Sequence, residues 1–287
     1  MRSALLLTLL SCAAAAAARI AILLTGMAGL PAVVLEGGAA LAAFGVCAYL
    51  GLCVLDGDQK KAVPMAQLSC AQVFWAAVLG ALAVAPVTLL CDAADAIIGA
   101  AQPAAEAGAM RAGAQFLPLV FKSALLVPVV EELFFRGYLL GALRRYGTAA
   151  AVLVSSLCFA LVHAGGQGIM MQLCYALLGA LFALGMIRTG GIAAAMIMHG
   201  CYNLTLILLS YAGLSGLFSG LSLISCVLRL SLCAAFAGAL RRLCLSLPVQ
   251  EVSAAPDEPF TRREKALVVA ACAAVLLAAV LMLLLGV

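Results

Sequence analysis

The chain has 287 residues, 67% of them hydrophobic and 10% charged, and its mean hydropathy is +1.21. Soluble domains are about 45–50% apolar and about 25% charged, because a water-soluble surface needs polar side chains to cover the core. The composition therefore excludes an ordinary soluble domain and indicates a protein whose solvent is the lipid bilayer. Aromatic residues make up only 6% of the chain and alternating strands are lacking, which argues against an outer-membrane barrel.

The net charge of +4 comes from dispersed basic residues without a stripe of interleaved aromatic residues, so nucleic acid is not an expected partner. The 12 cysteines are scattered through apolar segments and form no CxxC motif. This pattern favours small buried side chains over disulfides or a zinc knuckle.

Apolar stretches of membrane-spanning length recur along the chain and predict an all-α fold, a polytopic transmembrane helix bundle of about eight to nine spans. In chain order they are 4–28, 33–54, 68–90, 115–142, 149–164, 169–187, 191–211, 217–240 and 265–286. The lower count applies if the first stretch is a cleaved secretory signal, which Arg2 and the small residues Ala13–Ala18 resemble. An uncleaved first span is the preferred interpretation.

The basic connectors predict the orientation, because Lys and Arg are retained on the cytoplasmic side of a membrane. With the N-terminus inside, every basic pair falls on the inner side, namely Lys60/Lys61, Arg144/Arg145, Arg241/Arg242 and Arg262/Arg263. The outer connectors are then Pro31–Gly38, Cys91–Gly113, Gly165–Gly168 and Ala212–Leu217. Together with the Ala- and Gly-rich composition, this predicts a multi-pass integral protein of a bacterial cytoplasmic membrane.

Three parts are expected along the chain. Residues 1–112 would form N-terminal transmembrane helices, 113–212 a catalytic helical core, and 213–287 C-terminal helices with a polar loop near 245–264. The division rests on the central part, which concentrates the ionisable groups. Such groups are costly inside a membrane and mark function.

The first polar motif is Glu131-Glu132-Leu-Phe-Phe-Arg136. Consecutive residues of a helix diverge by about 100°, so the two carboxylates face different directions. Glu132 and Arg136 are four apart and can form an ion pair, which leaves Glu131 available for chemistry. The alternative is that both glutamates pair with Arg136 and only hold helices together.

Two further motifs lie on later helices. Phe159 and His163 are four apart, as are His199 and Asn203, so each pair shares a helix face. An imidazole and an amide at this spacing can hydrogen-bond one oxygen atom together. Each motif alone is also consistent with an interfacial histidine or with hydrogen bonds between helices.

The conjunction of the three motifs is more specific than any one of them. The chain has only 2 histidines, and both lie in these motifs. The other glutamate beside an early apolar stretch is Glu36, which a Gly-Gly turn explains. A carboxylate or an imidazole can take a proton from water, and nearby donors can stabilise the oxyanion that follows. The set can therefore hydrolyse a peptide bond.

Depth along the helices is a partial test of this set. At about 1.5 Å per residue, Glu131 is about 20 Å from Arg144, and His199 is about 17 Å from Arg188. His163, counted from Arg145, would be about 27 Å deep. The helix that carries His163 is therefore expected either to start inside the bilayer after Gly147 or to be steeply tilted.

The ordered set EExxxR, FxxxH and HxxxN resembles the CPBP family, which comprises the type II CAAX prenyl endopeptidases and the bacterial Abi or bacteriocin-processing homologues. All three motifs match, within 115–210. The resemblance implies an intramembrane endopeptidase in which Glu131 is the main catalytic carboxylate and His163 helps it to activate water. It also implies that His199 and Asn203 support the oxyanion.

The resemblance further implies supporting roles for Glu132 and Arg136, with Phe159 beside the histidine of its motif. The expected partners are the lipid bilayer and a peptide or protein substrate within or at the membrane. A lipidated CaaX tail is one such substrate, and a leader peptide or a bacteriocin is another.

The need for a metal stays open. One divalent ion, such as zinc, could be held by Glu131, His163 and His199. The pattern is not HExxH, so no helix supplies a ready pair of histidines. A metal-free glutamate mechanism is the preferred alternative.

Two other functions compete with proteolysis. One is a proton-coupled transporter in which the same residues titrate along a path, although no internal repeat of the transporter kind is evident. The other is a non-catalytic membrane scaffold or immunity factor. Outside the motifs, Arg229 is expected to pair with a neighbouring helix or to snorkel, and Gly179 and Ala183 are expected at helix contacts.

Overall fold

The computed structural model describes residues 29–54, 65–98, 116–163 and 168–245, together with Ala17 and Thr25. The predicted first and last spans, 4–28 and 265–286, and the polar loop near 245–264 lie outside this part of the chain. Within it the fold is all-α, as predicted, and contains no strand.

The first half of the described chain forms three long helical rods. The first consists of α2 (Leu30–Ala40), the π-helical η1 (Leu41–Val46) and α3 (Cys47–Val54), and the second of α5 (Cys70–Leu82) and α6 (Val84–Ile98). The third consists of α7 (Phe116–Val120), the π-helical η3 (Phe121–Leu126), α8 (Val127–Glu132), the π-helical η4 (Leu133–Leu139), α9 (Leu140–Leu143) and the 3-10 turn η5 (Arg144–Tyr146).

The second half continues with α10 (Thr148–Val162), α11 (Gly168–Thr189), α12 (Ile192–Tyr211), the 3-10 turn η6 (Ser215–Phe218) and α13 (Leu223–Leu245). By length and apolar composition, 5 helices of the described part could cross a membrane: Leu30–Cys53, Cys70–Ile97, Met170–Thr189, Ile192–Tyr211 and Leu223–Cys244. The chain is therefore an integral membrane protein in architecture, and the total of eight to nine spans stays a prediction.

Two segments predicted as outer connectors are helical. Pro31–Gly38 lies within α2, where Pro31 occupies the first turn and needs no N–H partner. Glu36 is therefore not at a turn; its carboxylate pairs with the Lys122 ammonium of η3. Likewise α6 continues past Cys91 to Ile98. The glycine and acidic residues predicted connectors here, but these residues form helix because a backbone in lipid has to satisfy its own hydrogen bonds.

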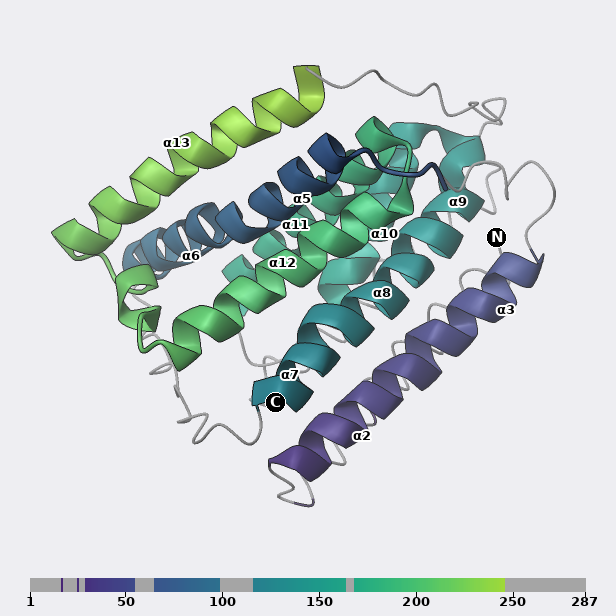
Figure 1. The fold of residues 1–287 in the computed structure, drawn as a ribbon, viewed down its shortest axis with the longest axis horizontal. Coiled ribbons are helices and arrows are strands. Elements are labelled where there is room, and N and C mark those ends of the chain that lie inside the picture. Colours follow the sequence, from purple (N-terminus) through teal and green to yellow (C-terminus); the bar gives the residue numbers. More distant parts are fainter. Residues whose placement is uncertain are drawn as a thin grey trace.

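Helix α12 lies at the centre of the bundle, between α5 and α8 (Figure 1), and it also contacts α11 and η3. Gly80 of α5 is required at the closest approach, because a Cβ there would stand 2.1 Å from the Met198 carbonyl oxygen. The α2 and α3 rod lies along one side of the bundle, and α13 lies along the other against α5 and α6. The residues of the three motifs are thus enclosed by helices from both ends of the described chain.

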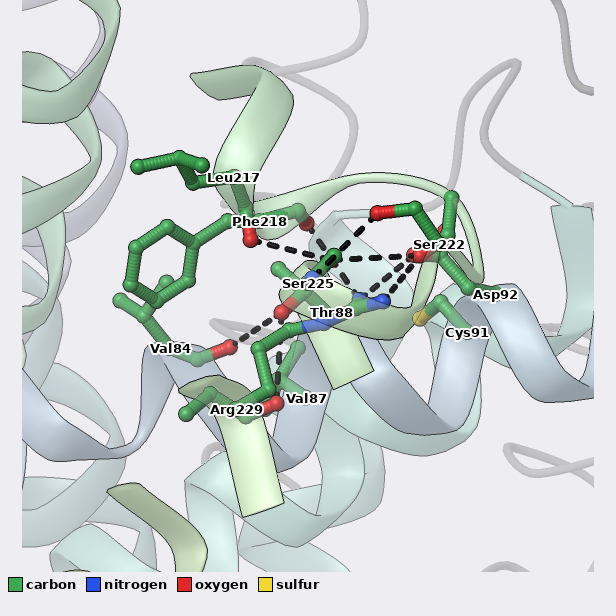
Figure 2. A network of polar contacts seen from close by, with 12 residues as sticks. Val84, Val87, Thr88, Cys91, Asp92, Leu217, Phe218, Ser222, Ser225 and Arg229 are labelled. Atoms are coloured by element: carbon green, nitrogen blue, oxygen red, sulfur yellow. Dashed lines mark hydrogen bonds and ion pairs between the residues drawn. The ribbon is translucent and has the colours of Figure 1, made fainter. Parts of the chain in front are cut away.

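A polar clamp fastens α13 to α6. Arg229 is fully buried and donates to the Asp92 carboxylate at 2.5 Å and to the Phe218 carbonyl at 3.4 Å, and also to the Gly220 carbonyl. Ser225 donates to the carbonyl of Leu217 at 3.0 Å (Figure 2). The prediction that Arg229 pairs with a neighbouring helix is confirmed.

Candidate active site

The predicted catalytic residues converge from three helices. Glu131 and Glu132 end α8, His163 follows the last turn of α10, and His199 lies in the middle of α12. Glu131, Glu132 and His199 are 5%, 0% and 3% exposed. The bundle therefore gathers two carboxylates and both imidazoles of the chain in its interior.

Glu131 and His163 face each other. The Oε2 atom of Glu131 lies 3.8 Å from Nε2 of His163. The other ring nitrogen of His163, Nδ1, lies 2.8 Å from the Phe159 carbonyl oxygen. Because a carbonyl only accepts hydrogen bonds, Nδ1 carries a proton, and Nε2 is the ring nitrogen that faces the carboxylate.

The residue at which α10 starts changes the expected difference in depth between His163 and Glu131. The helix starts only at Thr148, after the 3-10 turn η5, and its 15 residues end at Val162. At 1.5 Å per residue its length is about 22 Å, close to the about 20 Å between Arg144 and Glu131. Counted from Thr148 instead of Arg145, the depth of His163 is close to that of Glu131. The choice between a start inside the bilayer and a steep tilt stays a prediction.

Glu132 is the centre of a second, fully buried set. Its Oε1 atom accepts from Nη1 of Arg136 at 3.0 Å and lies 2.9 Å from Nδ1 of His199. A carboxylate only accepts, so Nδ1 of His199 donates to it. As predicted, Glu132 pairs with Arg136 four residues on, and Glu131 faces elsewhere. The carboxylate fixes the imidazole ring and leaves Nε2 as its second polar atom.

Aromatic rings hold both imidazoles in place. The Phe159 ring lies 4.5 Å from the His163 ring, 5.5 Å from the His199 ring and 4.5 Å from the Arg136 guanidinium carbon. Phe182 of α11 stacks on His199 at 5.0 Å. Phe159 therefore lies between the two sets, and its rigid face limits the orientations that both rings can adopt.

Asn203 makes a different contact from the other candidates. Its Nδ2 donates to the Ser123 carbonyl of η3 at 2.8 Å. Pro128 has no N–H to offer to the π-helical turn before it, and the Val127 N–H bonds to the Lys122 carbonyl instead. The Asn203 amide thus satisfies a carbonyl that the helix leaves open. Of its two N–H groups, one stays available for another acceptor.

Helix α11 supplies support that the motifs did not predict. The Tyr175 ring lies 4.6 Å from the His163 ring, and Nε2 of Gln172 donates to the His163 carbonyl at 3.2 Å. The Gly179 carbonyl accepts from Nη2 of Arg136 at 2.9 Å, and a Cβ on Gly179 would stand 3.0 Å from that nitrogen. The expected helix contact at Gly179 is confirmed.

The signals for these residues were present but weak. Gly179 is recognisable in the sequence as a small residue within an apolar helix. Pro128, three residues before Glu131, predicts that a carbonyl of the preceding turn lacks its backbone N–H partner. Tyr175 and Phe182 follow no motif, because aromatic residues in apolar helices are ordinary core residues. Only the packing of α11 against α10 and α12 assigns them to the site.

The expected metal set does not form as a group of three. Among residues 29–54, 65–98, 116–163 and 168–245 no group of three His, Cys, Asp or Glu side chains could hold an ion. The bonds of Nδ1 of His163 to Phe159 and of Nδ1 of His199 to Glu132 leave Nε2 of each ring as the nitrogen that a metal could take. Glu131 and His163 together offer two donors. A structural or catalytic zinc site usually has at least three protein ligands, and the need for a metal stays an open prediction.

Residues 113–205 match the family model of the type II CAAX prenyl endopeptidase Rce1-like proteins. The matched segment is a third of the chain and contains Glu131, His163, His199 and Asn203. The resemblance predicted from the three motifs is confirmed over this segment, and the match indicates a protease of the membrane. Neither the search of curated proteins nor the search of solved structures found a match.

Proposed function

We propose that the chain is an intramembrane endopeptidase in which Glu131 and His163 together take the proton of the attacking water. The observation that carries the proposal is the 3.8 Å separation of Glu131 Oε2 and His163 Nε2, with both side chains mostly buried. The family match over residues 113–205 supports the same class of reaction.

The tautomer of His163 defines the first step. Nε2 of the neutral ring and the Glu131 carboxylate are both acceptors, so a water between them can donate one hydrogen to each. A lone pair of its oxygen then attacks the carbonyl carbon of the scissile bond, and a water proton passes to Glu131 or His163. When the C–N bond of the tetrahedral intermediate breaks, this proton goes to the leaving nitrogen.

His199 and Asn203 would stabilise the oxyanion. The Nδ1–H group of His199 donates to Glu132, which fixes the ring so that its Nε2 side is the one that would face the oxyanion. The remaining N–H of Asn203 lies on the same face of α12, four residues away. Donors of this kind are worth about 10²–10³-fold in rate each.

Glu132, Arg136 and Phe159 would position this machinery rather than react. Arg136 neutralises Glu132 at 3.0 Å and is itself held by the Gly179 carbonyl. The pair therefore keeps the carboxylate on Nδ1 of His199 without a net charge in the membrane interior.

The substrate is a peptide or protein within or at the membrane, and a lipidated tail and an unmodified leader are the two classes to compare.

The test is cleavage of fluorogenic CaaX-type and leader-type peptides by the full chain in lipid nanodiscs. Glu131→Gln keeps the size of the side chain and removes the base, so the rate should fall by about 10²–10⁴-fold without loss of folded protein. The matched control is Glu36→Gln, the same change at a glutamate outside the site, which should cleave at the wild-type rate. Wild-type cleavage by Glu131→Gln would refute the mechanism.

Two further arms separate the rival functions. Cleavage that survives a strong chelator supports the metal-free mechanism, whereas loss that zinc restores supports a metal at Glu131 and His163. Proton-coupled flux in proteoliposomes without cleavage of any peptide would favour a transporter. Neither activity in well-folded wild-type protein would favour a scaffold.

A further inference from the structure

Three sulfur atoms meet between α6 and α11, on residues that the proposed proteolytic mechanism does not use. Sγ of Cys91 lies 3.4 Å from Sγ of Cys174 and 3.7 Å from Sδ of Met171. Met171 and Cys174 are three apart on α11 and therefore share a face. Cys91 approaches this face from α6, which packs against α11.

We propose that this sulfur cluster, Cys91, Met171 and Cys174, binds a soft monovalent cation, Cu(I). Thiolate and thioether ligands together select Cu(I) over the harder divalent ions. Metal–sulfur bonds of about 2.3 Å would place the sulfurs of a three-coordinate site about 4 Å apart. The two separations from Cys91, 3.4 Å to Cys174 and 3.7 Å to Met171, would need to widen by about 0.6 and about 0.3 Å to accept the ion.

The thioether distinguishes this proposal from a redox pair of thiols. A disulfide between Cys91 and Cys174 would leave Met171 without a role, although its sulfur is almost as close to Cys91 as the second thiol is. A metal site uses all three sulfurs. The cluster contains no imidazole or carboxylate that would attract zinc or magnesium in preference.

The two thiols differ in exposure. Cys174 is fully buried, but Cys91 is only partly buried and directly precedes Asp92 of the polar clamp (Figure 2). Binding replaces two S–H bonds by two S–Cu bonds, and the two protons are released. The product carries one negative charge, and no electron is transferred.

The experiment is a titration of the reduced, full-length protein in detergent with Cu(I), in competition with the coloured chelator bicinchoninate under anaerobic conditions. Wild type should hold one equivalent more than Cys91→Ala or Cys174→Ala at the same chelator concentration. Met171→Leu should retain that equivalent with an affinity about tenfold weaker, or about 1.4 kcal/mol. The double variant Cys201→Ala/Cys226→Ala, which removes two thiols outside the cluster, should bind as wild type.

Two results would overturn the site. One is equal Cu(I) binding by wild type, Cys91→Ala and Cys174→Ala, all confirmed as folded by thermal unfolding. The other is unchanged affinity in Met171→Leu together with a Cys91–Cys174 disulfide in the protein isolated without reductant, which would assign the pair to redox chemistry. Because the readout is metal binding, it is independent of whether the chain cleaves peptides.

Discussion

Two arginines in the described part of the chain are completely buried, and their surroundings differ. Arg136 and Arg229 are both 0% exposed, and each has a carboxylate partner. The partner of Arg136 is Glu132, which also binds the His199 ring at 2.9 Å. Arg229 pairs with Asp92, and its other acceptors are the backbone carbonyls of the loop before α13.

The two arginine–carboxylate pairs differ in whether their other partners can exchange protons. Apart from Asp92, the partners of Arg229 are backbone carbonyls, which neither take up nor release protons, and the clamp holds α13 and its preceding loop against α6. Glu132 instead joins a fixed cation to an imidazole, beside a second carboxylate and a second imidazole. An ionisable residue inside a membrane marks function by default, and the contact of Glu132 with the His199 imidazole is the reason why the proposed mechanism uses this pair.

The largest expected effect is that of Glu132→Ala. The change leaves Arg136 buried without its counter-ion and frees Nδ1 of His199, so the folded state should lose about 3–5 kcal/mol. Cleavage per folded molecule should fall as well, because the His199 ring is no longer oriented. Thermal unfolding in detergent and peptide cleavage measure the two effects on the same sample.

Glu131→Gln provides the contrast on the adjacent residue. It should lose cleavage with little loss of stability, because glutamine keeps the size of the side chain and the His163 ring, 3.8 Å away, is more exposed than Arg136. Equal stability losses in the two variants would mean that both glutamates only hold helices together.

The second prediction breaks the clamp. Asp92→Ala should cost about 2 kcal/mol, less than the loss at Glu132, because Arg229 keeps its carbonyl acceptors. Cleavage per folded molecule should stay at the wild-type level. The double variant Asp92→Leu/Arg229→Met, which removes both charges, should recover most of the stability. A large loss of cleavage in folded Asp92→Ala would contradict this prediction and would mean that the clamp contributes to the active site.

The third prediction concerns Asn203, which belongs to both kinds of contact. Asn203→Leu removes the donor to the Ser123 carbonyl, and one hydrogen bond between membrane helices is worth about 1 kcal/mol. If the second N–H also serves the oxyanion, kcat should fall by about 10²–10³-fold while KM changes little. A stability loss with unchanged kcat would mean that Asn203 only stabilises η3 through its hydrogen bond to the Ser123 carbonyl.

The sequence was sufficient for the parts of this picture that follow helix periodicity. The all-α fold, the Glu132–Arg136 pair, the different direction of Glu131 and the partner for Arg229 all come from residue spacing and from the cost of charge in lipid. The meeting of Glu131 and His163 was only implied, because a turn of unknown length, residues 144–147, sets where α10 starts. One residue more or fewer there would rotate His163 by about 100°.

Other features depend on packing that no local pattern contains. Nothing in α11 distinguishes Tyr175 or Phe182 from ordinary core residues, and their roles appear only when α11 lies against α10 and α12. Glu36 was misplaced for a related reason. Two glycines suggested a turn, yet a helix in lipid keeps its hydrogen bonds and accepts glycine at about 1 kcal/mol each.

The smallest expected effect is that of Glu36→Gln, and it calibrates the other pairs. The Lys122–Glu36 ion pair joins η3 to α2, but its carboxylate side chain is 43% exposed, in contrast to the 0% of Glu132. An exposed pair is worth about 0–1 kcal/mol, so the unfolding temperature and the cleavage rate should both stay close to wild type. A stability loss as large as that of Glu132→Ala would show that burial does not rank the ion pairs of this bundle. The inference that the Glu132 set is distinctive would then have to rest on its imidazoles alone.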